Sequence, residues 1–194
     1  EGSDETTDNY NLAQPVVVGS PNPDFTGGLT NHFEYKGFDL DILLSFVYGN
    51  EIYNGGGTYQ SANASWFDNQ TLDQMNRWQQ PGDVTDVPEA RFGYINGSSD
   101  SDRYLSDGSY MRIRNVSLGY TLPENVLNRI NMSHVRIFVG VTNLYTLTNY
   151  EGWDPEVNYT GTGRSTQSQN IIQGYDFYTA PQARTYSLGI NLTF

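Results

Sequence analysis

The sequence predicts an all-β fold, in which five antiparallel strands form part of the wall of a transmembrane β-barrel. Three observations support this prediction: apolar and polar residues alternate along the strands, an aromatic residue ends the chain, and short turns alternate with long polar loops. Successive side chains of a strand point to opposite faces. Strands of outer-membrane barrels are apolar outside and polar inside, with aromatic residues at both membrane interfaces.

The last strand, expected at residues 182–194, shows this alternation plainly. An aromatic C-terminus at the foot of such a strand is similar to the assembly signal of bacterial outer-membrane barrels. A sandwich strand that ends in Phe is the alternative. We therefore expect the outward residues of this strand to form a barrel assembly signal: Tyr186, Leu188, Ile190, Leu192 and Phe194.

Two strands are expected near the start, at residues 25–36 and 38–48, joined by a tight turn at Lys36 and Gly37. The second strand places Asp39 and Asp41 in its inward phase. Unpaired carboxylates are costly in a sandwich core, so this phase favours a watery lumen. The outward phases of the two strands are Leu29, Asn31, Phe33 and Tyr35, followed by Phe38, Leu40, Ile42, Leu44, Phe46 and Tyr48.

Two more strands are expected at residues 110–121 and 134–146. Arg112 and Arg114 break the alternation of the first, either through a bulge or because this half rises above the membrane. Between the strands, the capping-box spacing of Thr121 and Glu124 predicts a short helical turn within residues 122–131. The outward residues are Val116, Leu118 and Tyr120, followed by Val135, Ile137, Val139 and Val141.

Residues 49–109 and 147–181 are expected to be long polar loops, and the first contains no convincing strand. A helix is expected near residues 65–78, where Trp66, Leu72, Met75 and Trp78 share a helical face. We expect these side chains to pack the loop onto itself rather than to bind a ligand.

The order of short and long connections predicts which side of the membrane each loop faces. Outer-membrane barrels have short periplasmic turns and long extracellular loops. Five strands that pair in chain order therefore place the C-terminus in the periplasm. Known single-chain barrels have eight or more strands, so the wall must be completed by other strands.

Composition excludes several classes of function. The net charge of -12 argues against nucleic acid as a partner, and without cysteine the chain has no disulfide or Cys-based metal site. His32 and His134 lie on different expected strands without zinc-site spacing, and Gly55-Gly-Gly57 lacks the Lys of a P-loop. Asp154-Pro-Glu156 is the best acidic pair for calcium but lacks EF-hand spacing. We expect no metal, no cofactor and no catalytic residue, so the protein is not expected to be an enzyme.

Many short segments of the chain, in order, resemble the C-terminal barrel of SusC/RagA-type TonB-dependent transporters. Together they cover residues 22–194. They are Asn22-Pro-Asp-Phe-Thr-Gly-Gly28, Tyr35-Lys-Gly-Phe-Asp-Leu40, Tyr48-Gly-Asn50, Ile52-Tyr-Asn54, Arg77-Trp78, Thr85-Asp-Val-Pro88, Ser101-Asp-Arg-Tyr104, Asp107-Gly-Ser-Tyr110, Arg112-Ile-Arg-Asn-Val-Ser-Leu-Gly-Tyr-Thr-Leu-Pro123, Thr142-Asn-Leu-Tyr145, Tyr150-Glu-Gly-Trp-Asp-Pro-Glu-Val157 and Arg184-Thr-Tyr-Ser-Leu-Gly-Ile-Asn-Leu-Thr-Phe194.

The resemblance implies that residues 1–194 are the incomplete C-terminal part of a barrel of about 22 strands with a plugged lumen. It implies import of glycans or peptides across the outer membrane of Bacteroidota, with a SusD-like surface lipoprotein and the TonB complex as partners. The plug and N-terminal domains are absent from these residues. Trp66, Trp78 and Trp153 are the expected extracellular loop contacts.

A soluble, Tyr-rich carbohydrate-binding β-sandwich is the alternative function. A sandwich covers its apolar faces with its own second sheet, whereas a barrel leaves them for lipid.

Overall fold

The computed structural model of the protein describes residues 6–61, 67–93, 97–156 and 173–194. The chain divides into two compact units. The sheet unit consists of residues 23–50, 108–156 and 180–194, and the loop unit consists of residues 1–22, 51–107 and 157–179.

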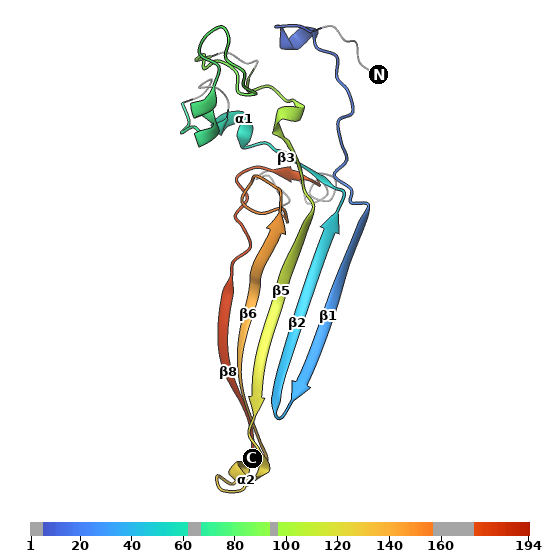
Figure 1. The fold of residues 1–194 in the computed structure, drawn as a ribbon, viewed down its shortest axis with the longest axis vertical. Coiled ribbons are helices and arrows are strands. Elements are labelled where there is room, and N and C mark those ends of the chain that lie inside the picture. Colours follow the sequence, from blue (N-terminus) through green and yellow to red (C-terminus); the bar gives the residue numbers. More distant parts are fainter. Residues whose placement is uncertain (1–5, 62–66, 94–96, 157–172) are drawn as a thin grey trace, which may run out of the picture. The chain divides into compact units, whose positions relative to one another are not determined.

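A five-stranded antiparallel sheet makes up most of the sheet unit, and each strand pairs with the next one along the unit (Figure 1). The all-β prediction and the pairing in chain order, including 38–48 with 110–121, are confirmed. In spatial order the strands are β1 (Phe25–Tyr35), β2 (Phe38–Tyr48), β5 (Tyr110–Thr121), β6 (His134–Thr148) and β8 (Thr185–Thr193).

The turn between β1 and β2 has the predicted two-residue form. Lys36 and Gly37 have φ angles of 49° and 86°, both in the left-handed region. Turns of this kind match the twist of antiparallel strands. The Gly37 carbonyl accepts a hydrogen bond of 2.8 Å from the Thr121 amide, so the turn is also fixed to β5.

The connection from β5 to β6 contains the predicted helical turn, but not the predicted capping box. Helix α2 spans Glu124–Leu127, and its N-cap is Pro123, without a side-chain capping bond. Thr121 is the last residue of β5, and its amide is hydrogen-bonded to Gly37. Its place in the strand prevents it from capping the helix.

The first half of β5 contains the bulge that was one of the two predicted explanations for its broken alternation. Leu43 pairs with Asn115 and Leu44 with Ile113, so Arg114 is an extra residue in β5. A bulge of this kind shifts the phase of the strand. Ile113 and Val116 consequently both join the apolar side of the sheet.

The loop unit contains strands that the sequence analysis missed, so the expectation of no strand within residues 49–109 is wrong. A three-stranded sheet has the order β4 (Leu105–Asp107), β3 (Glu51–Asn54) and β7 (Tyr175–Asp176). β3 is antiparallel to β4 and parallel to β7. Strands of two to four residues are too short to reveal a period of two in the sequence.

Residues 67–78 do not form the predicted helix of residues 65–78, and residues 65 and 66 lie outside the described residues. The loop unit instead has helix α1 (Gly57–Gln60) and 3₁₀ helices at Tyr10–Leu12, Leu72–Asn76 and Asp102–Tyr104. The turn at Leu72–Asn76 ends at Arg77, whose ψ of 151° is extended. Leu72 and Met75 are 87% and 71% exposed, so they do not form the packed face that would stabilise a longer helix.

Buried apolar side chains are few in both units. Those among the described residues are Ile52, Val87 and Tyr104 in the loop unit, and Tyr110, Leu127, Val135 and Tyr150 in the sheet unit. No helix within the described ranges is long and apolar enough to cross a membrane.

Candidate functional site

One side of the five-stranded sheet is a continuous apolar face. Directly paired residues of antiparallel strands point to the same side. Leu40 pairs with Leu118, Leu118 with Val139, and Val139 with Leu188, so one row of aliphatic side chains crosses four strands. The neighbouring rows are Phe38, Tyr120, Ile137 and Ile190, and Ile42, Val116, Val141 and Tyr186.

The apolar face is open in the described part of the chain. Leu188 is 76% exposed, Ile190 59% and Phe33 58%. Soluble monomers rarely expose contiguous apolar patches larger than a few hundred Å². This side of the sheet therefore requires a lipid or protein environment.

The residues predicted as an assembly signal lie at the end of this face. Tyr186, Leu188, Ile190 and Leu192 alternate along β8 on the apolar side. Phe194 follows the last strand residue and is 85% exposed. The Thr193 carbonyl accepts a 2.8 Å hydrogen bond from the Ser133 amide, which fixes the end of β8 beside the α2 connection. Recognition of these residues during assembly stays a prediction.

The opposite, polar side of the sheet carries an ion pair that crosses β5. Arg136 of β6 donates from Nε to Asp39 Oδ1 of β2 at 2.9 Å, and from Nη2 to Oδ2. Gly119 lies between the two in the sheet, and a Cβ there would collide with both side chains. Between the neighbouring strands β1 and β2, His32 Nδ1 lies 2.6 Å from Asp41 Oδ1.

These contacts change the interpretation of the two inward carboxylates. Asp39 and Asp41 each have a charged or ring-nitrogen partner. Their inward position alone therefore does not distinguish the watery lumen of a barrel from the core of a sandwich. The sequence analysis missed the pair of Asp39 and Arg136. The sequence did contain a sign of this pair. Asp39 and Arg136 carry opposite charges in the inward phase of their strands, and the strand between them has a glycine, Gly119.

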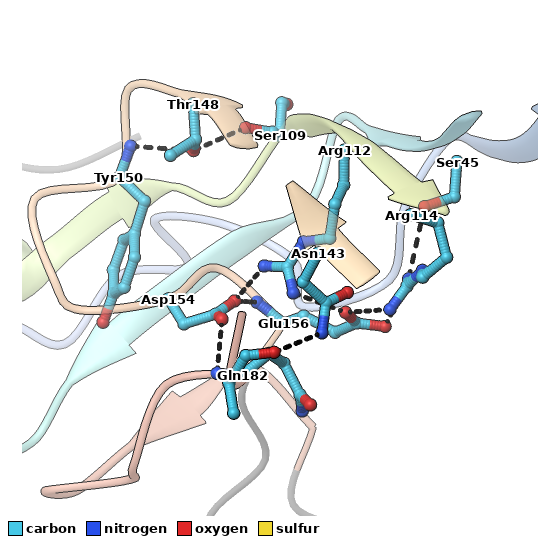
Figure 2. A network of polar contacts seen from close by, with 11 residues as sticks. Ser45, Ser109, Arg112, Arg114, Asn143, Thr148, Tyr150, Asp154, Glu156 and Gln182 are labelled. Atoms are coloured by element: carbon cyan, nitrogen blue, oxygen red, sulfur yellow. Dashed lines mark hydrogen bonds and ion pairs between the residues drawn. The ribbon is translucent and has the colours of Figure 1, made fainter. Parts of the chain in front are cut away.

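A second polar site, the arginine–carboxylate cluster, consists of Arg112, Arg114, Asp154 and Glu156 (Figure 2). Arg112 Nη2 is hydrogen-bonded to Asp154 Oδ1, and Arg112 Nη1 lies 3.2 Å from Glu156 Oε2. Arg114 binds both oxygens of Glu156 at 2.8 Å and also donates to Ser45 Oγ at 3.2 Å. The bulge at Arg114 places both guanidinium groups on the polar side of the sheet.

Backbone amides complete the binding of Asp154. Glu156 donates its amide to Oδ1 and Gln182 donates its amide to Oδ2, each at 2.9 Å. Burial by itself would raise the pKa of Asp154, but these two amides and Arg112 together hold the pKa below its usual value of 3.8. Asp154 therefore remains a carboxylate and links the loop before it to the segment that leads into β8.

Arg112 is the most deeply buried charged side chain described, at 1% exposure. Removing one partner of a buried ion pair leaves an uncompensated charge, which is far more costly than losing a surface pair. The cluster is therefore a structural centre that fixes residues 150–156 to the sheet.

The acidic pair noted as a calcium candidate is used in this cluster. Both carboxylates of Asp154-Pro-Glu156 contact arginines. No group of three or more His, Cys, Asp or Glu side chains placed to hold a metal occurs in the ranges that the structure describes.

The three predicted tryptophan contacts belong to separate parts of the chain, and their role stays a prediction. Trp66 lies outside the described residues. Trp78 is half-buried in the loop unit, where its amide donates to the Val87 carbonyl at 2.8 Å. Trp153 is 68% exposed beside the arginine–carboxylate cluster in the sheet unit.

Comparison with known proteins shows which proteins the chain is similar to. The chain is 36% identical over 182 residues, 94% of its length, to TonB-dependent receptor P3 of Formosa agariphila, and 27% identical over 92% of its length to TonB-dependent receptor SusC of Bacteroides thetaiotaomicron. Its fold matches part of the RagAB peptide importer in the closed-closed state, with a TM-score of 0.78 and 23% identity over 100% of the chain. The chain resembles a segment of a SusC/RagA-type TonB-dependent transporter. No family model matches it.

The chain spans only a small part of the length of these proteins. It covers 17% of receptor P3, 16% of SusC and 20% of the RagAB chain. The relatives are named as receptors and an importer rather than as enzymes, in agreement with the expectation from the sequence.

Proposed function

We propose that the chain is the C-terminal barrel segment of a SusC-like TonB-dependent importer in the outer membrane. The observation that carries this proposal is the open apolar face, which crosses all five strands of a single sheet. Such a face suits the lipid side of a barrel wall, and the opposite side carries the ion pairs and polar groups expected of a lumen.

A complete barrel is needed for this function. β1 and β8 each pair with one neighbour in the described sheet, and an unpaired strand edge in lipid leaves backbone groups without hydrogen bonds. The family resemblance implies about 22 strands, which enclose a plug. Residues 1–194 are then one incomplete segment, and import belongs to the whole receptor.

The connections support an orientation with the C-terminus in the periplasm. The two-residue turn at Lys36 and Gly37 and the α2 connection are short, whereas the chain between β2 and β5 and between β6 and β8 is long. Short turns are periplasmic in outer-membrane barrels. The loop unit and Trp153 then face the cell exterior.

We infer two partners and a class of cargo for the whole receptor. A SusD-like lipoprotein would cover the outer mouth, and the TonB complex would act on the parts that precede this segment. The cargo would be glycans or peptides, and the RagAB relative is described as a peptide importer. Trp66, Trp78 and Trp153 are candidate contacts for the cargo or the lipoprotein.

The test is a deletion and complementation experiment with the full-length receptor gene in its own host. We expect the receptor to fractionate with the outer membrane and to copurify with a SusD-like lipoprotein. Uptake of a glycan or peptide pool should stop when either the receptor or TonB is removed. A receptor that remains in the soluble fraction as a monomer without detergent would instead support the carbohydrate-binding sandwich.

A further inference from the structure

The loop unit contains an open pocket of about 370 Å³ beside β3. This volume falls within the range typical of small-ligand pockets. Three segments line it: residues 17–21, the strands β3 and β4, and residues 173–175. The side chains that the argument uses are Val17, Val18, Glu51, Tyr53, Leu105 and Tyr175.

The pocket combines apolar walls with one carboxylate. Val17, Val18 and Leu105 provide the aliphatic surface. Glu51 is the only described lining residue with a carboxylate, and no described Lys or Arg forms an ion pair with it. Its Oε2 accepts a 2.7 Å hydrogen bond from the Ser20 amide, which holds the carboxylate at the wall.

The surroundings of Glu51 add negative potential. Asp107 pairs with Glu51 across β3 and β4, so the two side chains lie on the same side of the small sheet. A further carboxylate, that of Asp100, accepts a 2.8 Å hydrogen bond from the hydroxyl of the lining residue Tyr53.

Two stacked tyrosines give the pocket an aromatic wall. Tyr53 and Tyr175 are paired residues of β3 and β7, and their rings stack at 5.7 Å with an interplanar angle of 16°. Aromatic rings attract cations through their π-systems. The pocket thus offers a carboxylate, aromatic rings and an aliphatic wall within one small volume.

We propose that this pocket binds a cationic side chain, Lys or Arg, of a peptide substrate. The aliphatic walls fit the methylene stem of such a side chain, and Glu51 fits its charged end. An amino sugar shares the ammonium group but has no long aliphatic stem. This inference rests on the proposed import function and narrows its cargo to basic peptides.

The test measures binding of short peptides to the full-length receptor, purified from membranes with its lipoprotein. The peptides are identical except for Lys, norleucine or Glu at one position, and a glucosamine oligomer is the competing ligand. The Lys peptide should bind about tenfold tighter than the norleucine peptide, as expected of one charge-assisted contact. Glu51→Gln keeps an oxygen for the Ser20 amide and should abolish this difference.

Two further variants separate the pocket from general charge and from folding. Glu151→Gln removes the same charge from an exposed residue that does not line the pocket, and should retain the Lys preference. Val17→Arg, at a residue that is 97% exposed, adds a competing cation at the pocket and should weaken binding of the Lys peptide.

Equal binding of the Lys and norleucine peptides to the unmodified receptor would overturn the proposal, and so would a Lys preference that survives Glu51→Gln. Glu51-dependent binding of the glucosamine oligomer alone would overturn the assignment to peptides. Failure of the import function would be seen separately, in uptake assays, as the absence of TonB-dependent import of any peptide or glycan.

Discussion

Arg112 and Asp154 form the contact on which the order of residues 150–156 depends. Both side chains are almost fully buried, and Asp154 also accepts the amides of Glu156 and Gln182. One carboxylate therefore joins a strand, a loop and the approach to the last strand. Neither residue type nor spacing predicted this contact, because the two residues are 42 positions apart.

Replacing Asp154 with Ala should cost about 3–5 kcal/mol, because the buried Arg112 guanidinium loses its buried partner and keeps only the partly exposed Glu156. Arg112→Met in the Asp154→Ala background should restore most of the loss, because no buried charge then remains. Denaturant unfolding of the full-length receptor in detergent, with both single variants and the double variant, measures this coupling. Additive losses would show that the two side chains do not depend on each other.

The lowered pKa of Asp154 predicts that residues 150–156 are held in place less firmly at acid pH. Because the folded state favours the carboxylate, its stabilising contribution is complete above the usual pKa of 3.8 and disappears as the pH falls through the lower folded value. Hydrogen exchange at the Glu156 amide, corrected for intrinsic rates, should stay slow down to about pH 4 and accelerate below it. The Asp154→Asn variant should show no such acceleration. Loss of protection already near pH 6 would contradict this assignment.

At the scale of single elements, the alternation of apolar and polar residues predicted the long strands, because such a strand has a pattern that can be seen in its own residues. The five long strands followed from it, because one face of each strand is mostly apolar, and their pairing in chain order followed from the alternation of short and long connections. The bulge at Arg114 was only one of two explanations, because a phase shift in sequence does not reveal its geometry. β3, β4 and β7 were missed because each is held by its neighbours rather than by its own pattern.

When a residue on the apolar face of β8 is replaced by a charged one, the loss of stability should depend on the position of that residue along the strand. Leu188→Arg should destabilise the barrel by about 2–4 kcal/mol if Leu188 lies near the membrane midplane, and Phe194→Arg by about 0–1 kcal/mol near the interface. Unfolding of the full-length receptor in lipid vesicles compares the two. Removal of Phe194 should instead lower the amount of receptor that reaches the outer membrane.

Two results would contradict this account of β8. One is an equal loss of stability for Leu188→Arg and Phe194→Arg. The other is an unchanged level of heat-modifiable barrel in cells whose receptor lacks Phe194, since this residue would then have no role in assembly.

For the whole receptor, residues 56–100 of the loop unit should be dispensable for the barrel but not for import. Replacing residues 56–100 with a Gly/Ser linker leaves all five long strands intact. We expect normal heat-modifiability in the outer membrane, together with weaker capture of the lipoprotein or reduced uptake. An unrelated surface loop replaced in the same way is the control. Normal lipoprotein capture and normal uptake would show that this segment has no part in either.

The central claim is that the sheet separates lipid on one side from a polar lumen on the other, and β8 tests it most directly. The 194 residues contain no cysteine, so single spin labels can be placed at each of residues 186–192 in a receptor cleared of other reactive thiols. In lipid vesicles, labels at Tyr186, Leu188, Ile190 and Leu192 should be accessible to oxygen but not to a water-soluble nickel complex. Labels at Ser187, Gly189 and Asn191 should show lower accessibility to oxygen. Equal accessibility at all seven positions, or the reverse alternation, would contradict the account.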